Sequence, residues 1–314
     1  MKVTTAKALE SPARVQASDR PALTVGLVQM HWHSDHETHE SNLRSGIEAA
    51  ANAGADIVFL PELTLSRYPA DTPPAGAPDA TAEILLDGPT HRFARHAAAD
   101  FGVYVHASLF EKTNEVDGRG LNVAIVVAPS GEIVARTPKT HIPVTAGYYE
   151  NKYFANGPAE PNPYPVYEIA GAAIGLPTCW DEWFPEVART YSLAGAELLA
   201  YPTAIGSEPD HPDFDTEPLW RQTIVGHAIA NGLFMVVPNR WGNEGLIEFY
   251  GSSFICDPYG RVLAQASRSG DEVLVAALDL AQRHDWLDLF PFLRTRRPDT
   301  YGPLTQPMIN PWHD

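Results

Sequence analysis

Cysteine is scarce in this chain of 314 residues, which contains only Cys179 and Cys256. Two cysteines are too few for a disulfide framework, so we expect free thiols and a reducing compartment, the cytoplasm. The sequence has no apolar run long enough to cross a bilayer. Its first residues also lack the apolar stretch of a secretory signal. We therefore expect no association with a membrane.

Positive charge is sparse as well. The chain has 22 lysines and arginines against 39 aspartates and glutamates, which gives a formal net charge of −17. The phosphate backbone of a nucleic acid and the surface of an anionic membrane both repel such a protein. We therefore expect no nucleic acid as a partner, and the charge is compatible with a small cationic or neutral molecule as the substrate.

Short apolar runs rich in β-formers alternate with helical patterns along most of the chain. Residues 22–30 read as a buried strand, residues 36–54 as a helix, and residues 167–179 as one further strand-like run. This alternation gives way to hairpins, which indicates an α/β protein with mixed sheets. We expect a flexible N-terminal extension over residues 1–21 and a single domain over residues 22–314.

Three polar residues stand at the ends of predicted strands or just after them. They are Glu62, Lys139 and Cys179. Ligands of α/β proteins usually bind at the carboxyl ends of strands. There a thiolate is a nucleophile, a carboxylate accepts its proton, and an ammonium stabilises negative charge. Each residue alone also fits a structural role: a small buried thiol, a turn cap and a solvated lysine.

The stretches around these residues resemble the signatures of a known family. "FLPELTLSRYP", "RTPKTHIP" and "PTCWDEWFPEVAR" are similar to the Glu, Lys and Cys motifs of the nitrilase superfamily, the carbon–nitrogen hydrolases. The resemblance implies an αββα sandwich, paired across a dimer into a four-layer αββα–αββα core. It also implies a homodimer or larger homo-oligomer, and neither a metal nor an organic cofactor.

The resemblance assigns roles to these residues. It implies that Glu62 is the general base, that Lys139 stabilises the tetrahedral intermediate and that Cys179 is the nucleophile. The segment "AGYYENKYF" is similar to the family segment that carries a second glutamate, and this puts Glu150 beside the thiol. We expect the backbone N–H of Trp180 to share the oxyanion with Lys139.

Further stretches narrow the resemblance. "CWDEWFPE", "YPTAIGSEP" and "GYYENKYFANG" are similar to the N-carbamoylputrescine amidohydrolase branch, which implies a thiol amidohydrolase that releases ammonia, carbon dioxide and an amine. Four alternatives stay open: a carbamoyl-β-alanine or carbamoyl amino acid amidohydrolase, an aliphatic amidase, a nitrilase, and a catalytically silent binding protein on the same fold.

Four residues are predicted to bind substrate: Trp180, Trp183, Tyr68 and Glu208. The two tryptophans flank the nucleophile, and their rings suit an aliphatic chain. Acidic residues follow Cys179 and favour a substrate with a distal ammonium. A substrate carboxylate would instead require an arginine in the pocket, and the candidates for that are Arg67, Arg221 and Arg240.

Four histidines, at positions 31, 33, 36 and 39, lie within nine residues and raise the possibility of a metal site. They span a predicted strand-to-helix transition, where four side chains do not converge on one point. We interpret them as surface or loop histidines. We interpret Cys256, in "SSFICDPYG", as a core residue of a hairpin and not as a second nucleophile.

Overall fold

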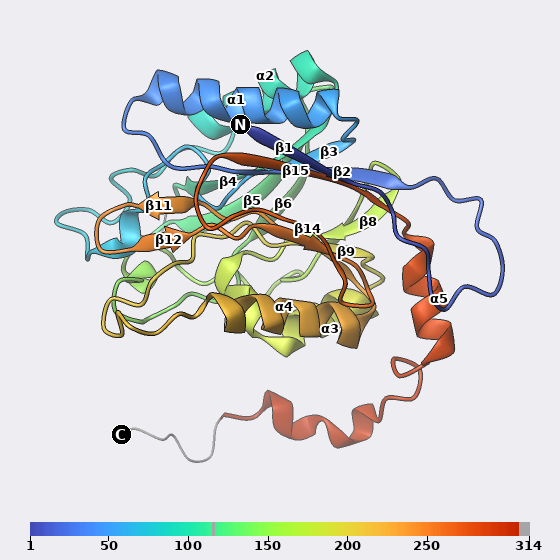
Figure 1. Ribbon diagram of the computed structural model, residues 1–314. Helices are drawn as coiled ribbons and strands as arrows, with labels where there is room; N and C mark the ends of the chain where they lie inside the picture. Colours follow the sequence, from blue (N-terminus) through green and yellow to red (C-terminus); the bar gives the residue numbers. More distant parts are fainter. Residues whose placement is uncertain (115–116, 308–314) are drawn as a thin grey trace.

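Two β-sheets packed face to face form the centre of the molecule (Figure 1). The computed structural model describes residues 1–114 and 117–307, so the last seven residues of the predicted domain lie outside it. In spatial order the first sheet consists of β1 (Lys2–Ala6), β15 (Glu272–Leu278), β2 (Leu23–Gln29), β3 (Ile57–Phe59), β4 (Tyr104–Glu111), β5 (Leu121–Val127) and β6 (Ile133–Pro138). The second consists of β14 (Val262–Gln265), β13 (Phe254–Cys256), β10 (Phe234–Val237), β9 (Leu198–Ala200), β8 (Ala172–Gly175) and β7 (Val166–Ile169).

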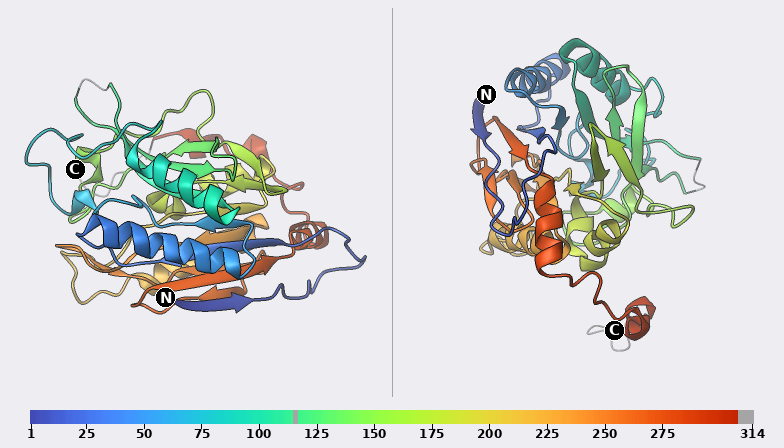
Figure 2. Two further views of the ribbon diagram at one scale, coloured as in Figure 1. Left: turned by 90° about the horizontal axis from the view of Figure 1, so that it is seen from above. Right: turned by 90° about the vertical axis from the view of Figure 1, so that its right-hand side faces the viewer.

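Helices cover the outer face of each sheet. α1 (His36–Asn52) and α2 (Pro89–Phe101) lie on the first sheet, and α3 (Pro185–Leu193) and α4 (Glu217–Asn231) lie on the second (Figures 1 and 2). A hairpin of β11 (Trp241–Asn243) and β12 (Glu248–Tyr250) and a last helix, α5 (Ala281–Leu289), complete the fold. The predicted αββα sandwich is confirmed. Within the described residues, no helix combines the length and apolar character needed to span a bilayer.

The apolar pattern of β2 shows why this strand lies at the centre of the sandwich. Leu23, Val25 and Leu27 pack between the two sheets, whereas Val28 packs under the outer helices. Successive side chains of a strand point to opposite faces, so a run that is apolar at almost every position needs cover on both sides. α1 supplies the outer cover, and it begins where the side chain of Asp35 accepts the backbone N–H of Thr38.

The N-terminal segment differs from the expected flexible extension. Residues Lys2–Ala6 form β1, which pairs in parallel with β15 at the edge of the first sheet. Further along, Arg14 contacts Asp279 at 2.7 Å and Asp285 at 2.8 Å, so this segment is fastened to the last helix and the turn before it. The sequence gives little sign of this, because the partners of β1 and Arg14 lie more than 250 residues away.

Residues 167–179, read as one strand-like run, form parts of two antiparallel strands. β7 and β8 are joined by a tight turn in which Ala170 has φ 50° and Gly171 has φ 78°. Two consecutive left-handed residues suit the twist of a two-residue hairpin. Glycine tolerates that conformation easily and alanine does not, which is why Ala-Gly is a weaker hairpin signal than Asn-Gly.

Candidate active site

Glu62, Lys139 and Cys179 follow three different strands and meet between the two sheets. Glu62 comes after β3, Lys139 directly follows β6, and Cys179 follows β8 at the first position of a 3₁₀ helix, η3 (Cys179–Trp183). The Lys139 ammonium lies 2.8 Å from Glu62 Oε1 and 2.6 Å from Glu150 Oε2. The structure therefore brings together the lysine and both glutamates that the sequence singled out, beside the cysteine.

One oxygen of Glu62 is fully engaged and the other is not. Its Oε1 accepts bonds from Lys139 and, at 2.7 Å, from Asn122 Nδ2, whereas Oε2 has no partner among the described residues. The side chain is completely buried. This leaves Glu62 with an oriented, available acceptor. Asn122 was missed by the sequence analysis because nothing in its local sequence signals a contact 60 residues away.

The thiol of Cys179 lies in a strained and buried position. Its φ of 42° is left-handed, and its backbone N–H donates to Pro202 O at 3.0 Å. Burial and the negative charge of Glu62 raise the pKa of the thiol well above its usual value, while Lys139 acts in the opposite direction. The resting residue is therefore a thiol and not a thiolate, so any reaction at sulfur needs a base.

Burial has unequal effects on the groups around the thiol. It disfavours the charged form of Lys139, but Glu150 and Glu62 outweigh it and hold the pKa of the ammonium well above its usual value. For Glu150, burial outweighs the attraction of Lys139 and raises the pKa to about 7. Tyr68 donates its hydroxyl to Glu150 Oε1 at 2.8 Å and favours the ionised form. Lys139 thus stays charged at neutral pH, whereas Glu150 lies close to its titration point.

Asp181 joins the cysteine turn to the lysine loop. One carboxylate oxygen accepts the N–H of Thr178 at 3.0 Å, and the other accepts the N–H of His141 at 2.9 Å. Thr178 precedes Cys179, and His141 lies two residues beyond Lys139. A single buried carboxylate therefore fixes the distance between the two segments.

A cavity of about 300 Å³ opens beside the thiol. Cys179 and Glu150 lie in its wall together with three of the predicted substrate residues, Trp180, Trp183 and Glu208. The remaining lining residues are Pro143, Thr145, Tyr148, Ile205, Phe214, Thr216 and Leu219. None of these side chains carries a positive charge. The cavity therefore combines apolar and aromatic walls with a carboxylate, Glu208, whose pKa burial raises.

Tyr68 differs from the other three predicted substrate residues. It is completely buried, and it is not among the side chains that line the cavity. Its hydroxyl bonds to Glu150 instead. Tyr148, in contrast, lines the cavity and donates its hydroxyl to Ser207 O.

The three arginines weighed for a substrate carboxylate are all occupied elsewhere. Arg67 pairs with Asp71 at 2.6 Å, and Arg221 lies 3.1 Å from Glu217 along α4. Arg240 is buried and pairs with its neighbour Glu244. None of the three lines the cavity beside Cys179.

A further buried carboxylate, Glu182, was not singled out from the sequence. It lies in η3 behind the nucleophile, and burial raises its pKa well above the usual value. Its Oε1 has no partner among the described residues. The local motif is so acidic that one carboxylate turning inward leaves no distinctive sequence signal.

The histidine-rich segment does not form a metal site in the described part of the chain, where no three His, Cys, Asp or Glu side chains are placed to hold an ion. His39 differs from the expected surface location, because it is buried in α1 with Nε2 2.9 Å from Thr64 O. Cys256 lies fully buried in β13, as predicted, and burial raises the pKa of its thiol.

The sandwich, with its site between the two sheets, defines the class of the protein: it has a nitrilase fold. A carbon–nitrogen hydrolase from Helicobacter pylori G27 shares this fold with a TM-score of 0.80 and 31% identity, over 92% of this chain and 100% of that one. The chain belongs to the carbon-nitrogen hydrolase family, whose model matches residues 24–287. It is a hydrolase that acts on carbon–nitrogen bonds other than peptide bonds.

Two similar proteins have names that concern ureido compounds. A citrullinase from Francisella tularensis subsp. tularensis is 35% identical over 289 residues, which cover 90% of this chain and 98% of that protein. An N-carbamoylputrescine amidase from Solanum tuberosum is 35% identical over 294 residues, which cover 90% of this chain and 94% of that protein.

Proposed function

We propose that the protein is a thiol amidohydrolase in which Cys179 is the nucleophile and Glu62 the general base. The raised thiol pKa creates the need for a base, and Glu62 Oε2 is buried without a partner in the described structure. Glu62 takes the thiol proton while sulfur attacks the carbonyl carbon of the substrate. Lys139 and the N–H of Trp180 stabilise the resulting oxyanion.

The remaining steps use the same groups. Glu62 delivers its proton to the departing nitrogen, so ammonia leaves and an acyl group stays on the sulfur of Cys179. Glu62 then accepts a proton from water, whose oxygen attacks the thioester carbon, and returns that proton to the sulfur of Cys179 as the carbon–sulfur bond breaks. With an N-carbamoyl amine, the released carbamate breaks down to carbon dioxide and the amine. Glu150 fixes the ammonium of Lys139 during both steps.

We propose an N-carbamoyl amine with a distal ammonium, such as N-carbamoylputrescine, as the substrate. The observation that carries this proposal is the cavity itself, in which Glu208 is present and positive side chains are absent from the lining. A distal ammonium would pair with Glu208 and favour its ionised form. Trp180 and Trp183, whose ring centroids are 6.4 Å apart, would pack on the aliphatic chain between the two ends.

The test is ammonia release from N-carbamoylputrescine, with N-carbamoyl-β-alanine and citrulline run beside it. We expect preference for the first. Cys179→Ala should lower turnover by more than about 10³-fold while the protein stays folded. Preference for a carboxylate-bearing substrate would overturn the proposed substrate, and a Cys179→Ala variant with near-normal turnover would overturn the mechanism.

A matched comparison isolates the role of Glu208. Glu208→Gln should raise KM for N-carbamoylputrescine by roughly tenfold or more, because it removes a charged hydrogen-bond partner. Butylurea, which has a similar chain but no ammonium, provides the control, and its KM should change little. Equal changes for both compounds would show that Glu208 does not recognise charge.

We further propose that the protein works in the cytoplasm as a homodimer or larger homo-oligomer. Both cysteines are free, which fits a reducing compartment. Exposed Leu193 and Ile229 on the second helical layer, and Phe290 after α5, offer apolar surface for a second copy. Residues 290–307, beyond α5, also extend from the body of the molecule (Figure 2). Sedimentation of the purified protein tests the proposal, and a monomer at micromolar concentration would overturn it.

A further inference from the structure

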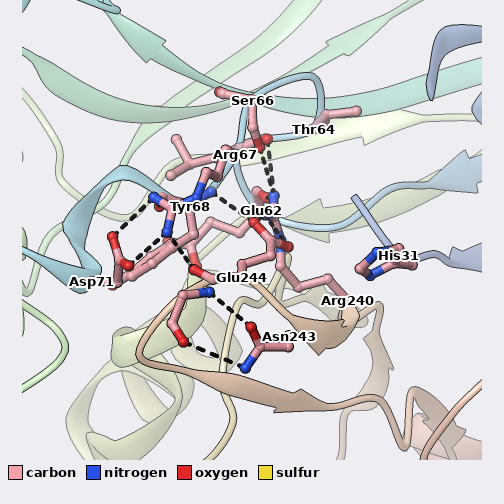
Figure 3. Close-up of polar contacts among 12 residues, drawn as sticks. His31, Glu62, Thr64, Ser66, Arg67, Tyr68, Asp71, Arg240, Asn243 and Glu244 are labelled. Atoms are coloured by element: carbon pink, nitrogen blue, oxygen red, sulfur yellow. Dashed lines mark hydrogen bonds and ion pairs between the residues drawn. The ribbon is translucent and has the colours of Figure 1, made fainter. Parts of the chain in front are cut away.

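A buried arginine, Arg240, donates hydrogen bonds to the loop that carries Glu62. Its Nη2 donates to the carbonyl oxygens of Glu62 at 2.8 Å, Leu63 at 3.1 Å and Ser66 at 3.2 Å. Its Nη1 donates to both carboxylate oxygens of Glu244, at 2.8 and 2.7 Å. Figure 3 shows Arg240 and Glu244 lying against this loop. One guanidinium therefore joins the segment after β10 to three carbonyls of the loop after β3.

Glu244 accepts a hydrogen bond from the other end of the same loop. Its Oε2 accepts the backbone N–H of Tyr68 at 2.9 Å, and the hydroxyl of Tyr68 reaches Glu150. The backbone oxygen of Glu244 also accepts a hydrogen bond from Arg67, which holds Asp71 (Figure 3). The pair Arg240–Glu244 thus contacts the loop at Glu62 and again at Tyr68. Glu62 in turn contacts Lys139, and Tyr68 contacts Glu150.

The loop is held partly by its own backbone, where Ser66 N–H donates to Leu63 O at 3.0 Å, and partly by Arg240. Leu63 has φ 51°, a left-handed conformation that a leucine adopts only under constraint. The carbonyls of Glu62 and Leu63, which accept hydrogen bonds from Arg240, lie in the protein interior, where an unpaired carbonyl is unfavourable. The planar, five-donor guanidinium suits several acceptors at once, whereas a lysine ammonium is a compact charge with three donors. A buried ion pair contributes little stability beyond a well-packed apolar pair. We therefore attribute to this pair the fixed position of the loop after β3.

We propose that Arg240 and Glu244 form a clamp that positions the general base and, through Tyr68, Glu150. This inference rests on the proposed function, in which Glu62 takes the thiol proton. The carboxylate of Glu62 is oriented by Asn122 and Lys139, while the clamp fixes the backbone from which that carboxylate extends. Arg240 and Glu244 touch neither the cavity nor the thiol, so they act as positioning residues.

The test compares Arg240→Lys and Glu244→Gln with the unchanged protein. We expect kcat on any substrate that the protein cleaves to fall by roughly a hundredfold, because small displacements of catalytic groups have effects of that size. KM should change by less than about threefold, since the cavity lining is intact. Glu244→Gln keeps the size of the side chain and an acceptor for Tyr68 N–H, so it is the milder variant.

A second measurement does not depend on the substrate. The rate of Cys179 alkylation by iodoacetamide, followed by peptide mass, should fall by roughly tenfold or more when Glu62 no longer accepts the thiol proton. If the unchanged protein hydrolyses no ureido compound, the proposed function fails, but this rate still decides whether the clamp exists. The buried thiol of Cys256 supplies an internal reference.

Arg261→Lys is the matched control. Arg261 also pairs with an acidic residue four positions away, Asp257 at 2.6 Å, and it also bonds to carbonyl and amide oxygens, those of Glu10 and Gln282. It lies outside the cavity, so kcat and alkylation should stay near normal. Folded clamp variants with unchanged kcat and alkylation would overturn the proposal. Equal losses in Arg261→Lys, or failure of both clamp variants to fold, would show a purely structural role and would also overturn it.

Discussion

At the scale of single residues, the site holds more buried acid than base. Lys139 is the one lysine in contact with Glu62 and Glu150 in the described structure, and Glu182 adds a third carboxyl group. Burial raises the pKa of Glu182 and of Cys179, and for Cys179 this keeps the proton on the thiol at neutral pH. The site therefore rests with its thiol protonated, and the carboxyl groups of Glu62 and Glu150 are paired with the Lys139 ammonium, which limits the cost of burying charge.

Tyr68 gives a prediction about pH. Its hydroxyl bonds to Glu150 and lowers the pKa of that carboxyl, which burial raises to about 7. Tyr68→Phe removes this bond, so the pKa of Glu150 should rise further. If the ionised form is active, the acid limb of kcat/KM should move to higher pH by about one unit, since a bond to a charged group is worth about 1.5–3 kcal/mol. A pH series of kcat/KM measures the shift.

Tyr153→Phe is the control for this shift. Tyr153 also donates a hydroxyl bond, at 2.9 Å, but its acceptor is the neutral carbonyl of Thr72. The acid limb of kcat/KM in Tyr153→Phe should coincide with that of the unchanged protein. An unmoved limb in Tyr68→Phe would contradict the role assigned to this hydroxyl.

The sequence predicted the residues with distinctive chemistry and missed those that support them. Glu62, Lys139 and Cys179 stand at strand ends inside recognisable motifs, so their neighbourhood was foreseeable. Asn122 and Arg240 were not, because each gains its role from a partner 60 or more residues away. Arg240 was even considered for substrate binding, since a sequence does not show whether an arginine faces a cavity or a backbone.

At the scale of elements, one contact between β8 and its neighbours leaves no room for a side chain. A Cβ atom on Gly175 would lie 2.5 Å from Tyr191 of α3 and 2.6 Å from Leu199 of β9. Gly175→Ala should therefore destabilise the protein by about 1–3 kcal/mol through overpacking. Urea unfolding measures this change.

Gly226 provides the opposite case. It is exposed in the middle of α4, and a Cβ atom there would meet nothing within 4 Å. Gly226→Ala should stabilise the protein by about 0.5–1 kcal/mol, because alanine restricts the unfolded chain and favours the helix. A Gly175→Ala variant as stable as the unchanged protein would contradict the packing described for β8. A destabilised Gly226→Ala variant would contradict the open space described in α4.

Long periodic elements were predictable from the sequence and short ones were not. α1 spans His36–Asn52, close to the predicted 36–54, and β2 lies inside the predicted 22–30. The split of β7 from β8 was missed because Ala170 and Gly171 interrupt an apolar run without the usual turn residues. β1 was missed because an edge strand needs few apolar side chains, and its partner is remote in sequence.

At the scale of the whole molecule, the N-terminal segment closes one edge of the first sheet. Removing residues 1–21 would leave the backbone groups of β15 unpaired along that edge. We expect the truncated protein to melt roughly 5 °C or more lower and to aggregate more readily. The rate of Cys179 alkylation should be unchanged, because no residue of this segment lines the cavity. Melting curves and light scattering test this.

Arg14→Gln separates the ion pairs from the strand. It breaks both contacts with Asp279 and Asp285, which are partly exposed, and should cost no more than about 1–2 kcal/mol. A truncated protein as stable as the full chain would show that β1 contributes nothing to the edge.

The position of β15 between β1 and β2 determines when these strands can pair during synthesis of the protein. Both neighbours leave the ribosome before their shared partner, Glu272–Leu278, is translated. While residues 30–271 are being synthesised, at about 5–20 residues per second, β2 waits for roughly 10–50 s with one edge unpaired. A nascent chain in this state is open to wrong partners, so we expect it to depend on chaperones during translation more than a protein whose neighbouring strands are consecutive.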